Sequence, residues 1–378
     1  RGTTCCRKKG LSEMHLCDVT LREGNQMPGR AYTADQKIAA GKILDNIGVG
    51  SIQAGFPITG EVDRETVSAL SEQVDASVTG LARARSDDVR AAISANADVV
   101  DIFIPISNKQ LNHSLGMCQS DALDALTNVV NMCTDTETAA QLTLADAFRA
   151  DISTVIKVFD RFPDIKHITL ADTVGARAHH SVEKYLQTLT ENVNDERIGV
   201  HFHDDMGLAT ANALTALNAG VGRIDVSVAS LGERAGNPAL EEVIVAGDME
   251  YNQSLVAKTT DVIPACQSIM EILDEDVAPG KAILGEEVTK HESGIHTAAM
   301  LETPDAFEPF NPAQYGGERT LIFGENTGRS GAQRLLSRAQ IEPTTEQIDN
   351  FLKILAKEGP IETSEAISLA MSKVDRDT

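Results

Sequence analysis

The sequence predicts a (β/α)8 TIM barrel followed by a C-terminal linker subdomain and a short helical subdomain. Eight short β-branched or apolar runs alternate with longer amphipathic runs between residues 15 and 246. Such alternation is typical of a barrel in which each strand is followed by a helix. A doubly wound open sheet is the alternative, but no Gly-x-Gly-x-x-Gly segment follows the first expected strand. We therefore expect a closed barrel.

The expected elements follow one another at regular spacing. We expect strands at residues 15–20, 51–56, 76–81, 99–104, 139–144, 166–171, 198–203 and 223–228. We expect helices at residues 34–47, 61–72, 87–95, 120–133, 151–162, 181–193, 207–219 and 238–246. The expected domains are a disordered or expression-derived tail (1–12), a catalytic barrel (13–260), a linker subdomain (261–328) and a helical subdomain (329–378) without a regulatory domain.

Composition narrows the class of protein. The net charge of −23 over 378 residues argues against a nucleic-acid partner, because phosphate binding needs basic surfaces. The sequence contains no run of eighteen apolar residues, so it predicts no membrane span. The six cysteines show no Cys-x-x-Cys spacing, which favours a reducing, cytoplasmic compartment. Acidic residues are spread along the chain, which suggests an acidic surface and a salt-loving source as hypotheses.

The stretch Asp18-Val-Thr-Leu-Arg-Glu23 closes the first expected strand. Barrels place their working residues at such strand-to-loop junctions. Asp18 could bind a cation, Arg22 could hold an oxyanion, and Glu23 could orient Arg22 or transfer a proton. The alternative is a turn with a surface ion pair.

His201-Phe-His203 ends the seventh expected strand. Because side chains alternate along a strand, both imidazoles face the same side. Two histidines with an oxygen ligand such as Asp18 make a plausible divalent metal site. Asn237, in the glycine-containing loop after the eighth strand, is the further side chain expected to reach it. The alternatives are a structural histidine pair and a simple closing loop.

More polar residues follow other strands and the barrel itself. Arg83, Gln141, Thr143 and Thr173 lie at or near expected strand ends, so they are candidates for the barrel mouth. Beyond the barrel, Lys290-His-Glu-Ser-Gly-Ile-His296 places Glu292 and His296 in one short acid/base cluster. A polar surface turn is the alternative for this cluster.

With these residues in order, the chain resembles the DRE-TIM metallolyase family, and within it the 2-isopropylmalate, homocitrate and citramalate synthases. The resemblance spans roughly residues 14 to 335 and is specific as an ordered set. Its motifs are Asp18 with Arg22-Glu23, Ala54-Gly-Phe-Pro57, Gly80-Leu-Ala-Arg83, Asp172-Thr-Val-Gly175, His201-Phe-His-Asp-Asp205, Gly232-Glu-Arg-Ala-Gly-Asn237, Lys281-Ala-Ile-Leu-Gly285 and His291-Glu-Ser-Gly-Ile-His296.

The resemblance implies a Claisen-type addition of the acetyl-CoA methyl carbon to a 2-keto acid, followed by thioester hydrolysis. A divalent metal (Zn, Mn or Mg) would polarise the keto acid, and Arg22 would stabilise the oxyanion. A homodimer is implied, because the family's His296-type pair reaches the neighbouring subunit's barrel. The implied site residues are Arg22, Glu23, His296 and Glu292 for catalysis, Arg83, Gln141, Thr143 and Thr173 for substrate, and Asp18, His201, His203 and Asn237 for metal.

The chain departs from the family at the fifth strand, where Gln141-Leu-Thr143 replaces Glu-Phe-Ser or Arg-Phe-Ser. Gln141 offers no charge to a second substrate carboxylate, so we expect 2-isopropylmalate synthase, an acyltransferase of leucine biosynthesis. Homocitrate or citramalate synthase is the alternative, and a metal-dependent acyl-CoA lyase is a further one. A non-catalytic paralogue also stays open, because Phe323-Gly-Glu-Asn-Thr-Gly328 replaces the family's Lys-His-Ser-Gly.

Overall fold

The computed structural model describes residues 14–374, so the predicted tail at residues 1–12 lies outside the described part of the chain. The chain divides into two compact units, with the division between Asp276 and Val277. From the sequence we expected domain boundaries after residues 260 and 328. The structure has one boundary instead, after Asp276.

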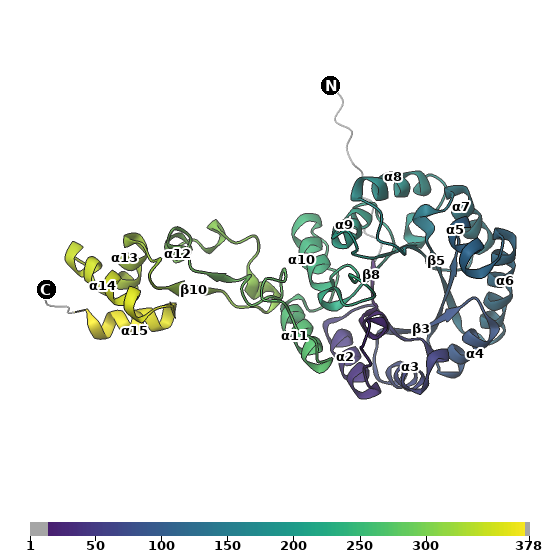
Figure 1. Ribbon diagram of the computed structural model, residues 1–378, viewed down its shortest axis with the longest axis horizontal. Helices are drawn as coiled ribbons and strands as arrows, with labels where there is room; N and C mark the ends of the chain where they lie inside the picture. Colours follow the sequence, from purple (N-terminus) through teal and green to yellow (C-terminus); the bar gives the residue numbers. More distant parts are fainter. Residues whose placement is uncertain (1–13, 375–378) are drawn as a thin grey trace, which may run out of the picture. The chain divides into compact units, whose positions relative to one another are not determined.

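The first unit is the predicted TIM barrel. Eight parallel strands close in the order of the sequence, and β1 pairs with both β2 and β8. The strands are β1 (His15–Asp18), β2 (Ser51–Gly55), β3 (Ser77–Arg83), β4 (Val99–Pro105), β5 (Ala139–Ala145), β6 (Ile168–Asp172), β7 (Ile198–Phe202) and β8 (Arg223–Val226). Figure 1 shows these strands as an inner ring with the helices outside them.

The outer layer consists of helices that connect successive strands. The longer ones are α2 (Ala34–Ile47), α3 (Glu61–Gln73), α4 (Ser86–Ser94), α6 (Gln119–Asp135), α7 (Ile152–Arg161), α8 (His179–Thr190), α9 (Ala209–Asn218) and α10 (Leu240–Tyr251). Two short helices, α1 (Thr20–Glu23) and α5 (Asn108–Gln110), follow β1 and β4. Because strands of a barrel are covered on both sides, β2, β6, β7 and β8 are buried along their whole length.

Local signals define the helix ends. Thr33 caps α2 through a capping box with Gln36, and Gly48 ends the helix at φ 87°, a conformation that favours glycine. On the inner face of α2, Lys37 is fully buried and forms an ion pair with Asp63 of α3 at 2.5 Å. This pair joins α2 to α3, and Asp63 also accepts a hydrogen bond from Phe56 N, just after β2, at 2.9 Å.

Helix α11 (Val262–Ile272) belongs to the barrel unit and not to a separate linker. Gln36 of α2 donates to the carbonyl of Ile272 at 2.8 Å. Tyr32 donates to Glu275 at 3.0 Å. These long-range contacts explain why the unit extends to Asp276.

The second unit has a core of its own. Its elements are β9 (Lys290–His291), α12 (Gly294–Met300), β10 (Thr320–Phe323), α13 (Arg329–Arg338), α14 (Thr345–Glu358), β11 (Ile361–Glu362) and α15 (Thr363–Lys373). The three strands form a sheet in the order β11-β10-β9. Leu321 and Phe323 of β10 share one hydrophobic cluster with residues of α12 to α15. The predicted linker and helical subdomains thus form one unit from Val277 onward, because they share this core.

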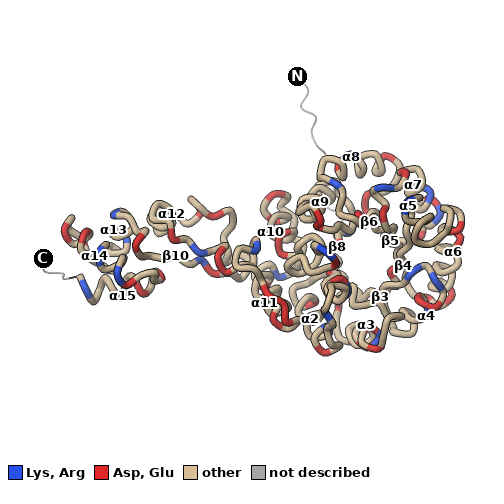
Figure 2. The backbone as a smooth tube through the Cα atoms, in the orientation of Figure 1, with Lys and Arg blue, Asp and Glu red and all other residues tan. Residues whose placement is uncertain are grey.

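The distribution of acidic residues and the hydropathy of the helices agree with what the composition predicts. Figure 2 shows acidic residues distributed over the helices of both units and not gathered in one segment. None of the helices in residues 14–374 is long and apolar enough to cross a membrane.

Candidate functional site

The turn after β1 places two charged side chains at the carboxyl end of the strand. Asp18 is the last residue of β1, and its carboxylate accepts hydrogen bonds from Thr20 N at 2.9 Å and Thr20 Oγ1 at 3.0 Å. This closes the turn, so α1 begins at Thr20 and carries Arg22 and Glu23. Leu21, between Thr20 and Arg22 in the sequence, is fully buried.

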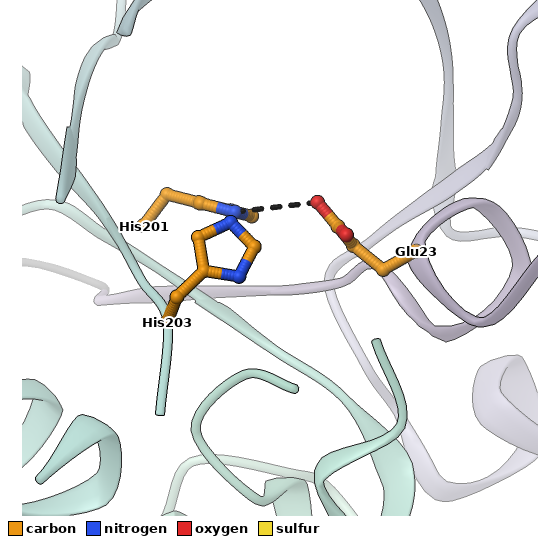
Figure 3. Close-up of side chains that lie close together, drawn as sticks. All are labelled: Glu23, His201 and His203. Atoms are coloured by element: carbon orange, nitrogen blue, oxygen red, sulfur yellow. Dashed lines mark ion pairs between the residues drawn. The ribbon is translucent and has the colours of Figure 1, made fainter. Parts of the chain in front are cut away.

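Strand β7 brings two imidazoles to the same end of the barrel. His201 lies within the strand and His203 follows its last residue, so the two side chains face the same way. Their ring centroids lie 5.0 Å apart at an interplanar angle of 74°. His201 Nε2 lies 3.4 Å from Glu23 Oε1, and Figure 3 shows Glu23 directed at the histidine pair.

Glu23, His201 and His203 form a buried group whose ligand atoms all lie within 4.8 Å of one another. It is the one group of three or more such ligands within residues 14–374. His203 Nδ1 is buried and has no hydrogen-bond partner in the described part of the chain. One carboxylate and two imidazoles are suitable ligands for a divalent transition metal. The group therefore fits a metal ion.

The electrostatics of the group favour an ionised Glu23 and a neutral His203. Burial opposes ionisation of Glu23, but the charges of Arg22 and His201 outweigh it and hold the pKa of Glu23 well below its usual range. Burial, together with the charge of His201, lowers the pKa of His203 to about 3, so its imidazole is neutral and can act as a ligand. Although burial opposes it, hydrogen bonding to Asp225 and Glu23 raises the pKa of His201 to about 9.

The structure places Glu23 with the two histidines and does not place Asp18 in that group. Glu23, which the sequence assigned to catalysis, lies with the histidines, whereas Asp18 is engaged by Thr20. Burial raises the pKa of Asp18 to about 7. The reason for the difference is the turn at Thr20. The Asp18 carboxylate is bound by Thr20 in this turn, whereas the Glu23 carboxylate lines the cavity.

Asn237 lies next to the group but presents the other end of its amide. Its Nδ2 donates to the carbonyl of Phe202 at 2.9 Å and lies 3.3 Å from His201 Nε2. Its Oδ1, the atom that a metal would take, has no hydrogen-bond partner among the described residues. A Cβ atom on Gly232 would lie 2.2 Å from this oxygen, which therefore faces the loop backbone.

A cavity of about 210 Å³ opens in front of the group. Arg22 lies in its wall, with 11% of its side chain exposed. The Arg22 guanidinium donates to Gln53 Oε1 through Nε at 2.5 Å and to Glu23 through Nη1. The other lining residues are Glu23, Gln26, Gln53, Leu81, Phe103, Thr143, Ala145, Ala171, Thr173, His201, His203, Asp225 and Glu233.

Two of the four predicted substrate residues line this cavity. Thr173 Oγ1 accepts a hydrogen bond from Asp146 N at 2.8 Å, which leaves the hydroxyl proton free to be donated. Thr143 Oγ1 donates to Asp101 at 2.7 Å, so this hydroxyl can offer the cavity only an acceptor.

The other two predicted substrate residues lie elsewhere. Arg83 forms a bidentate ion pair with Asp88 at the start of α4, and 47% of its side chain is exposed. Gln141 lies in the barrel interior, where its amide donates to Asp101 at 2.8 Å and accepts from Arg223. Neither lines the cavity. Arg83 is held by its ion pair with Asp88, and Gln141 is held by hydrogen bonds with Asp101 and Arg223.

Glu292 and His296 belong to the second unit. Glu292 accepts a hydrogen bond from Asn326 at 3.0 Å. The His296 ring stacks on Phe307, with centroids 4.1 Å apart. Ile295, between them in sequence, is 77% exposed, so this turn presents an apolar side chain beside two acid/base residues.

Sequence reasoning missed three residues that contact the site from below. Gln53, Asp101 and Asp225 are buried in strands β2, β4 and β8. Charged or amide residues inside otherwise apolar strands were the available signal, since such groups need partners when buried.

A (β/α)8 barrel with a carboxylate, two imidazoles and an arginine at the carboxyl ends of its strands has the arrangement of a TIM-barrel enzyme whose residues are suited to hold a metal. Residues 13–272 match the family model described as HMGL-like, and residues 283–359 match the one described as homocitrate synthase post-HMGL domain-like. The chain belongs to the HMGL-like family, in the DRE-TIM synthase group that its motifs predicted.

Curated relatives carry three different synthase names. The homocitrate synthase AksA of Methanopyrus kandleri is 35% identical over 344 residues, which cover 90% of this chain and 86% of the relative. A probable 2-isopropylmalate synthase of the same organism is 32% identical, covering 90% and 68%. The (R)-citramalate synthase CimA of Methanocaldococcus jannaschii is 29% identical, covering 92% and 71%.

Solved structures with the same fold include HMG-CoA lyases. An HMG-CoA lyase of Bacillus subtilis superposes with a TM-score of 0.62 at 21% identity, covering 71% of this chain and 96% of the lyase. A hydroxymethylglutaryl-CoA lyase of Pseudomonas aeruginosa gives 0.63 at 21% identity, covering 70% and 95%. These similarities support the barrel fold.

Proposed function

We propose that this protein condenses acetyl-CoA with a 2-keto acid and hydrolyses the resulting thioester. The observation that carries the proposal is the buried Glu23–His201–His203 group beside Arg22 in one cavity. The names of the relatives, all synthases of 2-hydroxy acids, support the same class of reaction.

The residues suggest a role for each group in the reaction. A divalent metal held by Glu23, His201 and His203 would act as a Lewis acid toward the keto-acid carbonyl. The methyl carbon of acetyl-CoA bonds to the carbonyl carbon, and the carbonyl oxygen gains negative charge before it takes up a proton. Arg22 is held by Gln53 and Glu23, so its guanidinium is oriented before charge develops on that oxygen. Water then cleaves the thioester and releases CoA.

Thr173 is proposed to bind the keto-acid carboxylate. Its hydroxyl already accepts from Asp146 N, so its proton is directed to another acceptor. Glu292 and His296 are proposed as the acid/base pair that removes the methyl proton, supplied by the second unit of a neighbouring subunit in a homodimer. Proton abstraction by a positioned histidine is an ordinary form of general base catalysis.

Among the three synthase names, the cavity favours a branched aliphatic keto acid and hence 2-isopropylmalate synthase of leucine biosynthesis. Its apolar wall is made by Leu81, Phe103, Ala145 and Ala171. Arg22 is the one Lys or Arg that lines it among residues 14–374. A keto acid with a second carboxylate would need a second cation to hold that charge when it is buried.

Homocitrate synthase is the second candidate. The match of residues 283–359 to the homocitrate synthase post-HMGL domain-like model favours it, as does the 35% identity to AksA. A lyase activity has less support, because the lyase structures share the barrel and cover only about 70% of this chain.

The test is CoA release from acetyl-CoA with 2-ketoisovalerate, 2-oxoglutarate, pyruvate, oxaloacetate and glyoxylate, with and without a chelator. We expect chelator-sensitive release, fastest with 2-ketoisovalerate. Fastest release with 2-oxoglutarate would replace 2-isopropylmalate with homocitrate as the product. No release with any keto acid from folded, metal-loaded protein would refute the proposed condensation.

A further inference from the structure

A buried chain of polar residues connects His201 with Arg22 beneath the cavity. We call it the interior network and define it as Gln53 of β2, Asp101 of β4, Gln141 of β5, and Arg223 and Asp225 of β8. All five side chains are buried. Four strands of the barrel therefore contribute to one continuous set of contacts.

One end of the interior network holds His201. Asp225 Oδ2 lies 3.1 Å from His201 Nδ1. Arg223 Nε donates to the other oxygen, Asp225 Oδ1, at 2.8 Å. Because a carboxylate held by an arginine is an acceptor, Nδ1 of His201 is the donor in this contact. The opposite nitrogen, Nε2, faces Glu23 and is the one that the neutral ring would offer to a metal.

The other end holds Arg22. Arg223 Nη1 donates to Gln141 Oε1, and Gln141 Nε2 donates to Asp101 Oδ2 at 2.8 Å. Gln53 Nε2 donates to the same Asp101 oxygen at 2.7 Å. With its amide nitrogen committed to Asp101, Gln53 must present Oε1 to Arg22, and it accepts from Arg22 Nε at 2.5 Å.

The directions of these hydrogen bonds are fixed by the charges. Arginines only donate and carboxylates only accept, so each amide between them has one allowed orientation. Reversing the Gln53 amide would set its nitrogen against Arg22 and its oxygen against Asp101. Each side chain of the network therefore fixes the orientation of the next one, from strand to strand.

Stability alone does not explain such a network. Buried ion pairs are often replaceable by apolar residues of similar volume without loss of stability, because their desolvation offsets their attraction. Residues that hold a metal-binding imidazole are known to affect affinity even though they do not touch the metal. Positioning of the groups at the site explains this arrangement better than stability does.

We propose that the interior network is a positioning unit, in which Asp225 fixes the liganding nitrogen of His201 while Asp101, through Gln53, fixes the guanidinium of Arg22. The inference rests on the proposed metal group and concerns residues outside that group, two of which, Gln53 and Asp225, also line the cavity. It assigns roles in orientation to Asp225, Asp101 and Gln53.

The first experiment measures Co²⁺ affinity by its visible absorption and by chelator competition, without substrate. Asp225→Asn is expected to weaken Co²⁺ binding by about 10- to 100-fold, because the amide can donate to Nδ1 and so favour the wrong tautomer. The matched control is Asp63→Asn, which also removes a buried carboxylate from a cation, Lys37, on the outer layer. It is expected to bind Co²⁺ within about 3-fold of wild type.

Two further variants keep the test decisive. His203→Ala removes a proposed ligand and should abolish Co²⁺ binding; wild-type affinity in this variant would refute the proposed metal group itself. If His203→Ala loses binding and Asp225→Asn does not, only the positioning role fails. Should Asp225→Asn not fold, Asp225→Glu replaces it, and its displaced acceptor is expected to weaken binding by about 3- to 10-fold. Wild-type affinity there would overturn the role.

The second experiment follows the Nε–Hε NMR signal of Arg22 in ¹⁵N-labelled protein, identified by its loss in Arg22→Lys. Gln53→Leu is expected to shift this signal and speed its exchange with water, because the acceptor at 2.5 Å is gone. Its Co²⁺ affinity is expected to stay within about 3-fold of wild type. An unchanged Arg22 signal in Gln53→Leu would refute the Arg22 half of the proposal.

Discussion

The substitution Glu23→Gln tests whether a metal is held by the group that the structure brings together or by the ligands that the sequence predicted. The amide keeps the size of the side chain but removes the one carboxylate of the group with His201 and His203. Removal of residues outside the ligand sphere already costs metal sites about 10- to 100-fold in affinity. Loss of the carboxylate ligand should therefore weaken Co²⁺ or Zn²⁺ binding by at least about 100-fold, or about 2.8 kcal/mol.

Asp18→Asn is the matched comparison. Asp18 accepts from Thr20 N and Thr20 Oγ1, and an amide oxygen can keep one of these hydrogen bonds. We expect a loss of about 1–2 kcal/mol in the free energy of unfolding. Metal affinity is expected to stay within about 3-fold of wild type, because Asp18 is not in the ligand group.

Isothermal titration calorimetry at about pH 7.5 would measure the metal affinity of each variant. Urea unfolding followed by circular dichroism would measure the free energy of unfolding. The reasoning is refuted if Asp18→Asn loses metal binding while Glu23→Gln retains it. That result would restore Asp18 as the ligand, as the sequence motif suggested.

Three other predictions concern the fold and the assembly. The rings of His15 and His167 stack with their centroids 5.9 Å apart. Burial lowers the pKa of His15 to about 4 and that of His167 to about 3. The folded state therefore favours neutral imidazoles, and free energy of unfolding that is present above the unfolded pKa of 6.5 is lost as the pH falls toward 4. His167→Gln should reduce the slope of unfolding free energy against pH, measured with urea between pH 7 and pH 5, by up to about 1.4 kcal/mol per pH unit; an equal slope contradicts this. Gly222→Ala would place a Cβ atom 1.8 Å from a backbone carbonyl oxygen, so soluble yield and thermal midpoint should fall sharply, and a wild-type midpoint would exclude the clash. If His296 acts in the neighbouring barrel, mixed dimers of Arg22→Ala and His296→Ala should regain about a quarter of wild-type activity, whereas action within one subunit gives none.

The sequence was sufficient to predict the barrel and the location of its mouth. The alternation of buried strands with amphipathic helices depends on local patterns that can be recognised in the sequence alone. Strands β1 to β8 therefore lie close to where they were expected. The pairing of His201 with His203 followed from the two-residue period of a strand, which needs no tertiary information.

The division into units and the direction of side chains were beyond the sequence. Helix α11 joined the barrel because of contacts with α2 that are more than two hundred residues away in sequence. Arg83 ends β3 as expected, but its ion pair with Asp88 holds it away from the cavity. Gln141 lies within β5, where Arg223 and Asp101 bind its amide in the barrel interior. Motif spacing contains no information on such competing partners.

By itself the sequence determined the fold class, the family motifs and the residues from which a metal group could be built. Only the tertiary structure decided that Glu23 and not Asp18 joins the histidines, and that Asp225, Asp101 and Gln53 hold the site from below. The physical reason is that a strand fixes which side a residue faces, whereas a turn such as the one at Thr20 fixes direction through hydrogen bonds. Buried charges then take the partners that the closed barrel brings to them.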